Sequence, residues 1–162
     1  MTSQDEKRKL MRFSSEEKQM AELAVEGFIT VEGLGDKPYR QYKVSVNAQS
    51  FCKNTFAKVN GPHVFTIKAS AGYPKDAPVA TFTSVPIAHI NVYENGNVCI
   101  GAWNPQETMA STALRIVRLI LMDPKTFNFK SMADKNCEVF CKGRCGEEIL
   151  PSPALPGISQ PR

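Results

Sequence analysis

The stretch "AHINVYENGNVCIGAW" (88–103) concentrates the side chains that could do chemistry. It holds one of only two histidines, His89, an amide side chain, Asn91, a thiol, Cys99, and the only tryptophan, Trp103. A thiolate is a strong nucleophile, and an ordinary cysteine with a pKa near about 8.5 is ionised to a few per cent at neutral pH. A free cysteine between apolar residues is, however, often only a small buried hydrophobic side chain. The local sequence alone favours that second interpretation of Cys99.

The composition is that of one globular domain and excludes several classes of protein. The chain has 162 residues, 42% of them hydrophobic and 22% charged, and its net charge of +4 does not require a nucleic-acid partner. No glycine pattern of a nucleotide-binding loop is found. The longest apolar run, "IVRLILM", is too short to cross a bilayer. No secretory signal is visible, so the five cysteines are expected to be reduced thiols of a cytoplasmic protein.

Hydrophobic periodicity and turn residues predict a helix, four strands and two further helices. The first helix is expected over 4–26, the strands over 28–33, 39–46, 63–71 and 79–85, and the later helices over 109–122 and 131–142. Thr108 and Ser131 are expected to cap the later helices. Ser14 with Glu17 resembles a capping box, so the first helix either runs through from Asp5 or restarts near Ser14. The connection 47–62 is predicted as a long loop. Short alternating strands favour an antiparallel meander, so the fold class is α+β with helices packed on one face of a four-stranded sheet.

The order and spacing of several short motifs resemble those of the ubiquitin-conjugating enzymes. The matching residues are Tyr73-Pro74, Pro78, His89-Ile90-Asn91, Asn95-Gly96, Cys99, Trp103-Asn104-Pro105 and Asp123-Pro124. The resemblance covers about residues 5–142 and implies the fold of that family, with residues 1–146 as the catalytic domain. The stretch 147–162 is rich in proline and is expected to be a disordered tail.

Three features depart from the family pattern. Ile90 replaces the proline of the His-Pro-Asn motif, which leaves the turn beside Asn91 less fixed. The segment between Cys99 and Trp103 is shorter than in typical eukaryotic members and looks more like the compact members of prokaryotes. Lys75 follows Tyr-Pro at a position where many members carry an apolar residue that docks a ligase.

The resemblance implies an acyl-transfer reaction at Cys99. The thiol would accept ubiquitin or a ubiquitin-like protein as a thioester from an activating enzyme and pass it to an amine of a target, usually a lysine. Asn91 would donate a hydrogen bond to the oxyanion that forms, or alternatively would only shape its loop. The resemblance makes His89 structural, and Tyr73, Pro74, Trp103 and Pro105 belong to the motifs that frame the site.

The group that many members use to activate the acceptor amine has no clear counterpart. The family often places a carboxylate beyond the Asp-Pro pair, and the nearest match in "DPKTFNFK" is Asn128. Asp123 is acidic, but it is expected to belong to the helix terminus. The acid is therefore absent or lies elsewhere.

Basic residues suggest where partners would bind. In the family the first helix helps to dock the activating enzyme, so Lys7, Arg8 and Arg12 are expected to bind that partner, although such a cluster is usually just a solvated helix face. Lys75 lies where a RING-type ligase would dock. No cofactor, metal, nucleic acid or membrane is expected to take part.

Two other functions stay open. One is a catalytically impaired binding module that scaffolds a ubiquitin-like conjugation complex, which Ile90 and the missing acid favour and the retained Cys99 opposes. The other is a thiol-redox or cysteine-hydrolase protein, which the lack of a Cys-x-x-Cys pair opposes. Cys137, Cys141 and Cys145 lie four residues apart and are interpreted as a helix face, because a zinc site needs a fourth ligand and no histidine is nearby in the sequence.

Overall fold

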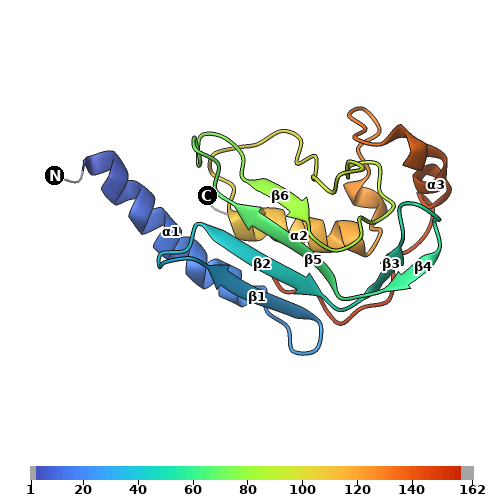
Figure 1. The fold of residues 1–162 in the computed structure, drawn as a ribbon, viewed down its shortest axis with the longest axis horizontal. Coiled ribbons are helices and arrows are strands. Elements are labelled where there is room, and N and C mark those ends of the chain that lie inside the picture. Colours follow the sequence, from blue (N-terminus) through green and yellow to red (C-terminus); the bar gives the residue numbers. More distant parts are fainter. Residues whose placement is uncertain (1–2, 158–162) are drawn as a thin grey trace.

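The computed structural model describes residues 3–157 and has the predicted α+β architecture (Figure 1). Its elements are α1 (Gln4–Glu22), β1 (Ile29–Leu34), β2 (Gln41–Val46), β3 (Gln49–Phe51), β4 (Lys58–Asn60), β5 (His63–Lys68), β6 (Val79–Phe82), α2 (Met109–Ile120), η1 (Pro124–Thr126), η2 (Lys135–Cys137) and α3 (Glu138–Gly143). Strands β1, β2, β5 and β6 form one antiparallel sheet in that order, which confirms the predicted four-stranded meander.

Helix α2 covers one face of this sheet and forms the main core with it (Figure 1). Alternate side chains of the central strands β2 and β5 point into the core, among them Val44 and Phe65, both fully buried. The helix begins as predicted at Thr108, whose hydroxyl accepts from the N–H of Ser111 at 3.1 Å, while the Ser111 hydroxyl accepts from the N–H of Thr108 at 3.2 Å. This reciprocal capping box satisfies N–H groups that no helical carbonyl can reach.

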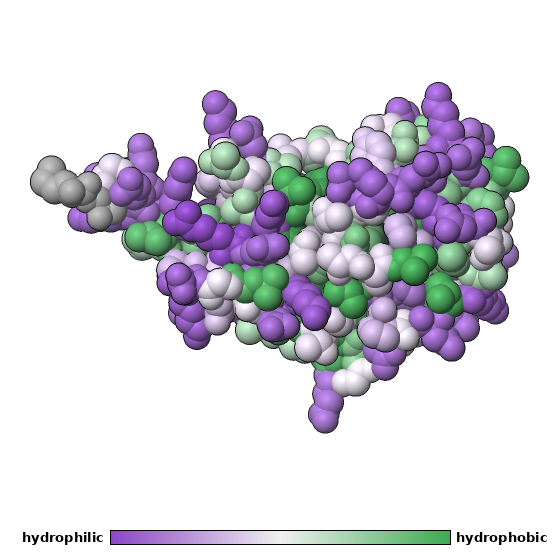
Figure 2. Space-filling model, in the orientation of Figure 1, coloured by the Kyte–Doolittle hydropathy of each residue, from purple (hydrophilic) through white to green (hydrophobic). Residues whose placement is uncertain are grey.

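Helix α1 runs without interruption from Gln4, which confirms the continuous alternative and shows that the predicted capping box at Ser14 is wrong. The cap is Ser3, whose hydroxyl accepts from the N–H of Glu6 at 3.1 Å. Glu17, the other half of the expected box, instead accepts from the N–H of Tyr39 at 2.9 Å. The N-terminal part of α1 projects from the body and carries hydrophilic side chains (Figures 1 and 2).

Residues 47–62, predicted as a loop, contain the β3–β4 hairpin. Its register pairs Gln49 with Asn60 and Phe51 with Lys58. Strands of three residues are too short to show an alternation of polar and apolar side chains, and in β3 the neighbours Ser50 and Phe51 are both buried. The hydroxyl of Ser50 donates to the carbonyl of Ile120 at 2.6 Å. The hairpin thereby supplies a donor to a carbonyl at the C-terminal end of α2.

The last helix starts later than the sequence predicts. The backbone N–H groups of Ala133 and Asp134 both donate to the carbonyl of Ile90, at 2.7 and 3.0 Å, which holds residues 131–134 out of a helical path. Asp134 then caps η2 by accepting from the N–H of Asn136 at 3.0 Å. Ser131 therefore caps no helix, and α3 occupies only the second half of the predicted range.

Part of the predicted tail contacts the body. Leu150 is buried and its N–H donates to the carbonyl of Leu121 at 2.9 Å, and Leu155 packs against the main core. The domain boundary at residue 146 and the disorder of 147–162 stay predictions, and residues 158–162 lie outside the described residues. No helix in the described part of the chain has the length and apolar character that a membrane crossing requires.

A buried ion pair joins the β3–β4 hairpin to η2. The ammonium of Lys53, in the hairpin turn, lies 2.7 Å from a carboxylate oxygen of Asp134, and the two residues are 8% and 6% exposed. Burial acts to raise the pKa of Asp134, but hydrogen bonds and charge, mainly from Lys53, hold that pKa below its ordinary value. The same ammonium donates to the carbonyl of Val92 at 2.7 Å, so it also fixes the segment before Cys99.

We expect Lys53→Met to lower the free energy of unfolding by about 3–5 kcal/mol, because the carboxylate of Asp134 would stay buried without its partner. Urea unfolding followed by the fluorescence of Trp103 measures this loss. Lys53→Met combined with Asp134→Leu should recover part of it, since no buried charge remains.

The control for this prediction is the exposed ion pair of α3. Lys142 lies 3.0 Å from Glu138, with side chains 60% and 32% exposed. Lys142→Ala should cost only about 0.3–0.5 kcal/mol, as is usual for exposed helical pairs. If Lys53→Met were as mild as Lys142→Ala, the ion pair of Lys53 would not hold the segments together.

Candidate active site

Cys99 lies at the end of a tight turn that folds back on Asn91. The N–H of Tyr93 donates to the carbonyl of Asn97 at 2.8 Å, and the N–H of Gly96 donates to the carbonyl of Tyr93 at 2.9 Å. The N–H of Cys99 then donates to the carbonyl of Asn91 at 2.8 Å. The two motif residues, eight apart in sequence, are therefore directly paired through their backbones.

This turn is attached to β6, the last strand of the sheet. The N–H of Phe82 donates to the carbonyl of Gly96 at 2.9 Å, and the N–H of Val98 donates to the carbonyl of Ala80 at 3.0 Å. Gly96 has a φ of +93°, and a Cβ there would lie 2.9 Å from the carbonyl oxygen of Phe82. Only glycine permits this close approach, so the Asn-Gly turn has a structural reason.

The thiol of Cys99 is partly exposed and lines a groove of about 280 Å³. One wall is the segment 98–102, and the other is formed by α2 and residues 125–128. Arg115 of α2 spans between them, because its guanidinium donates to the carbonyl of Ile100 at 2.7 Å. Cys99 therefore lies in a groove whose two walls are tied together by Arg115.

The side chain of Asn91 is held by hydrogen bonds to the segment that follows α2. Its Nδ2 donates to the carbonyls of Asn128, at 3.2 Å, and Ser131, at 3.1 Å, and its Oδ1 accepts from the N–H of Asn128 at 3.0 Å. This is the loop-shaping arrangement, one of the two roles considered for Asn91. Since catalytic hydrogen bonds often form only with substrate present, the oxyanion role stays a prediction.

His89 is fully buried, and both ring nitrogens bond within the chain. Nδ1 accepts from the N–H of Asn91 at 3.0 Å, and Nε2 lies 2.9 Å from the hydroxyl of Thr126. Because that hydroxyl donates its own proton to the carbonyl of Asp123 at 2.6 Å, Nε2 must be the donor. Burial, and secondly the charge of Lys53, lower the pKa of His89 to about 3. The ring is therefore neutral at physiological pH and positions Asn91.

No carboxylate lines the groove among the described residues. Asp123 accepts from the N–H of Lys125 at 3.0 Å and caps η1, and Asn128 is an exposed amide that accepts from the N–H of Lys130 at 3.1 Å. The charged side chains that line the groove are Arg115 and Lys125. An incoming ammonium would therefore meet positive charge near Cys99.

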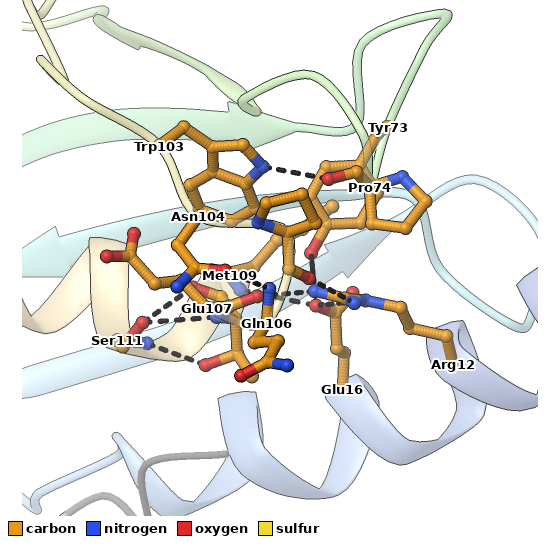
Figure 3. A network of polar contacts seen from close by, with 12 residues as sticks. Arg12, Glu16, Tyr73, Pro74, Trp103, Asn104, Gln106, Glu107, Met109 and Ser111 are labelled. Atoms are coloured by element: carbon orange, nitrogen blue, oxygen red, sulfur yellow. Dashed lines mark hydrogen bonds and ion pairs between the residues drawn. The ribbon is translucent and has the colours of Figure 1, made fainter. Parts of the chain in front are cut away.

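The remaining motif residues form a polar network that ties α1 to the chain beyond Cys99 (Figure 3). The indole N–H of Trp103 donates to the carbonyl of Pro74 at 2.8 Å, and the hydroxyl of Tyr73 donates to the carboxylate of Glu16. The ring of Tyr73 also stacks on Phe13, 5.9 Å between centroids. Glu16 is 2% exposed, and burial raises its pKa although Tyr73 and other donors act to lower it.

Arg12 belongs to this network. Its guanidinium donates to the carbonyl of Pro105 at 2.7 Å and to that of Glu107, and it lies 3.5 Å from the carboxylate of Glu16. These contacts account for Arg12 without a partner. Lys7, Arg8 and Lys75, in contrast, are exposed. The partner-binding role predicted for these residues and Arg12 stays a prediction.

The other cysteines lie away from the groove wall that carries Cys99. Cys137 and Cys141 are buried in a second apolar cluster with Phe51 and Ile90, whereas Cys145 is exposed. No group of metal-ligating side chains that could hold an ion is found in residues 3–157.

Three contributors to the site escape sequence reasoning. Lys53 carries no local signal, since its partners lie 36 to 84 residues away in the chain, and Thr126 contacts His89 across 37 residues. Glu16 has a weak one, because it follows Arg12 by four residues, a spacing that places both side chains on one face of a helix.

Comparison with known proteins finds similarity to ubiquitin-conjugating enzymes in both sequence and structure. A family model described as ubiquitin-conjugating enzyme matches residues 12–143. A probable ubiquitin-conjugating enzyme E2 W of Dictyostelium discoideum is 35% identical over 57 residues, an alignment that covers 33% of this chain and 38% of that relative. The alignment thus spans well under half of the relative's length.

Solved structures share the fold. The Plasmodium vivax ubiquitin conjugating enzyme E2 matches with a TM-score of 0.52 and 22% identity, over 67% of this chain and 98% of the other. Human ubiquitin-conjugating enzyme E2 G1 matches with a TM-score of 0.50 and 20% identity, over 68% and 95%. The relatives named here are eukaryotic, so the expected likeness to prokaryotic members is not supported.

The buried neutral state of His89 predicts a dependence of stability on pH. Below about pH 6.5 the unfolded chain binds a proton at this ring that the folded chain does not bind until about pH 3. Stability should therefore fall as the pH drops through this window, by up to about 1.4 kcal/mol per pH unit from this group. Urea unfolding between pH 7 and 5 should show a shallower slope for His89→Gln than for the unaltered chain.

Nitrogen NMR of the unaltered chain tests the same point without a substitution. The His89 ring should stay neutral, with its proton on Nε2, at pH 5. A ring that becomes protonated between pH 7 and 6 would contradict the arrangement.

Proposed function

The chain belongs to the ubiquitin-conjugating enzyme family, and on that premise we propose that Cys99 carries ubiquitin or a ubiquitin-like protein as a thioester. The thiol takes the acyl group from the cysteine of an activating enzyme and passes it to an amine of a target. The observation that carries this proposal is the position of the partly exposed Cys99 in a groove between the 98–102 segment and α2.

The groove suits an extended C-terminal tail. Its walls mix apolar side chains such as Ile100 and Leu119 with backbone and amide groups, and Gly101 and Ala102 leave room beside the thiol. A thioester formed there has the side chain of Asn91 in the same groove. We assign Asn91 the task of donating Nδ2–H to the oxyanion when an amine attacks, which requires Nδ2 to release one of its two hydrogen bonds to the carbonyls of Asn128 and Ser131.

The acceptor amine must be neutral to attack. With Arg115 and Lys125 as the charged lining, the groove offers no carboxylate to take its proton. The proposal therefore assigns that proton to solvent or to a carboxylate brought by a target or a RING-type ligase.

The partners proposed are those of the family: the modifier, an activating enzyme and a ligase. Exposed Lys7 and Arg8 on the projecting part of α1, and exposed Lys75, support the proposed docking positions. The free state of the cysteines agrees with the proposed cytoplasmic location.

A non-reducing gel tests the thioester. The chain is incubated with an activating enzyme, ATP and ubiquitin, beside Cys99→Ser and Cys99→Ala. We expect an adduct that reductant removes, because a thioester exchanges with thiols. Cys99→Ala should form none, and Cys99→Ser should form an ester that resists reductant.

Cys145→Ala is the matched control, since this cysteine is more exposed than Cys99 but does not line the groove. It should load like the unaltered chain. An adduct that persists in Cys99→Ala would place the acyl group on another cysteine. A folded protein that never forms the adduct with any modifier tested would favour the non-catalytic binding module.

Asn91→Ala separates the two roles of the amide. If Nδ2 serves the oxyanion, discharge of the thioester to free lysine should slow by about 10²–10³-fold while loading stays unchanged. Single-turnover assays measure the two rates separately. Asn128→Ala is the control, because Asn91 bonds only backbone groups of Asn128. Equal losses in loading and discharge for Asn91→Ala would indicate the loop-shaping role alone.

A further inference from the structure

We propose that the chain selects acceptor lysines that have a carboxylate beside them, and that the ammonium of Lys125 binds this carboxylate. The inference rests on the proposed thioester at Cys99 and names the class of acceptor that takes the acyl group. The feature that carries it is the charge of the groove of about 280 Å³, in which Arg115 and Lys125 are the charged lining residues. An acceptor amine must approach the thioester in the presence of these two cations.

The ammonium of Lys125 is available to an incoming anion. The residue is exposed, and within residues 3–157 no hydrogen bond or ion pair engages its Nζ. Its backbone is held in η1, where the N–H of Lys125 donates to the carboxylate of Asp123 at 3.0 Å. The free positive charge is therefore carried by a fixed point of the chain beside the groove.

Arg115 adds a second positive charge, but this side chain is partly occupied. One terminal nitrogen of its guanidinium donates to the carbonyl of Ile100 at 2.7 Å. That carbonyl is neutral, and no ion pair in the described part of the chain compensates the guanidinium. Arg115 therefore adds to the positive potential of the groove, while Lys125 is the cation that is free to move onto a partner.

The carboxylates of the neighbouring surface do not neutralise this groove. Three of them line an adjoining hollow of about 870 Å³, those of Asp123, Glu147 and Glu148. None of the three lines the groove that holds the thiol, and none forms an ion pair with Lys125. A carboxylate that faces the thioester must therefore come from a bound molecule.

The acceptor is the partner that needs this carboxylate. Its ammonium is repelled by Arg115 and Lys125, and it must lose a proton before it can attack. A carboxylate has two oxygens, so one can accept from Nζ of Lys125 while the other accepts the proton of the amine. A lysine with uncharged neighbours lacks both effects, and a lysine between cations meets additional repulsion.

The reaction balances without a further reagent. The acceptor ammonium gives one proton to its neighbouring carboxylate, which passes it to solvent. The neutral nitrogen then attacks the thioester carbonyl, a C–N bond forms, the C–S bond breaks, and the nitrogen loses a second proton to solvent. The sulfur of Cys99 leaves as a thiolate and regains a proton. Lys125 stays a cation throughout and is a positioning residue.

Three matched peptides test the preference. Each is acetylated at its N-terminus and holds one lysine, which is flanked on both sides by glutamate, by glutamine or by arginine. Cys99 is first loaded with ubiquitin and ATP is then removed, so that discharge alone is followed. Discharge to the glutamate peptide should be about fivefold faster than to the glutamine peptide, and discharge to the arginine peptide should be slowest. The differences should shrink between about 0.05 M and about 0.5 M salt, because salt screens exposed charges.

Lys125→Glu removes the charge that the inference depends on. In this variant the advantage of the glutamate peptide should disappear. The measured quantity is the ratio of two discharge rates within one variant, so it does not depend on how well that variant is loaded. Lys130→Glu is the matched control, because this exposed lysine follows Lys125 by five residues and does not line the groove. It should keep the preference of the unaltered chain. A preference that survives in Lys125→Glu, or that Lys130→Glu removes equally, overturns the inference.

A second way of loading separates this inference from the proposed function. A short peptide ending in glycine, supplied as an activated thioester with a small thiol leaving group, acylates Cys99 without an activating enzyme. A preference for the glutamate peptide in this arm supports the inference even when enzymatic loading fails. If Cys99 is loaded but discharges equally to the three peptides, or to none of them, the inference falls and the proposed thioester stands. If neither route acylates Cys99, both fall together.

Discussion

One buried ammonium holds together the irregular segments on which the candidate active site stands. The chain from residue 88 to the start of α2 contains no helix or strand of the main sheet, so its carbonyls need partners from elsewhere. The ammonium of Lys53 donates to two of these carbonyls, that of Val92 at 2.7 Å and that of His89 at 3.5 Å. The same ammonium also pairs with the carboxylate of Asp134. A charge buried in this way is expensive unless every partner is present. The hairpin turn, the segment before Cys99 and η2 therefore depend on one another.

The charge of Lys53 also shapes the chemistry next to it. It disfavours a second positive charge on His89, which is one reason why that ring is neutral and accepts from the N–H of Asn91. The opposite nitrogen then reaches Thr126, so the ring connects the Asn91 segment to η1. The amide of Asn91 makes a parallel connection to residues 128 and 131. The 125–128 wall of the groove is thus held by two neutral side chains, His89 and Asn91, and the charge of Lys53 helps to keep His89 neutral.

Local patterns predict those parts of the molecule that local forces determine. The alternation in β2 and β5 and the cap at Thr108 are visible in the sequence, because periodicity and capping act over a few residues. The β3–β4 hairpin, the late start of α3 and the role of Lys53 depend on contacts between distant segments, such as the carbonyl of Ile90 accepting from Ala133 and Asp134. In the site, motif spacing indicated Cys99, Asn91 and His89. Their hydrogen-bond partners, which decide what each side chain is free to do, needed the fold.

The charge of the groove bears on how the proposed thioester would react with acceptor amines. Without a lining carboxylate, the groove does nothing to concentrate ammonium groups or to remove their protons, so amines are ranked by how close they are held. A target lysine would then react efficiently only if its own protein, or a ligase, docks firmly enough to supply a high effective concentration and a carboxylate of its own. On the proposed function, productive transfer therefore depends on an assembled complex.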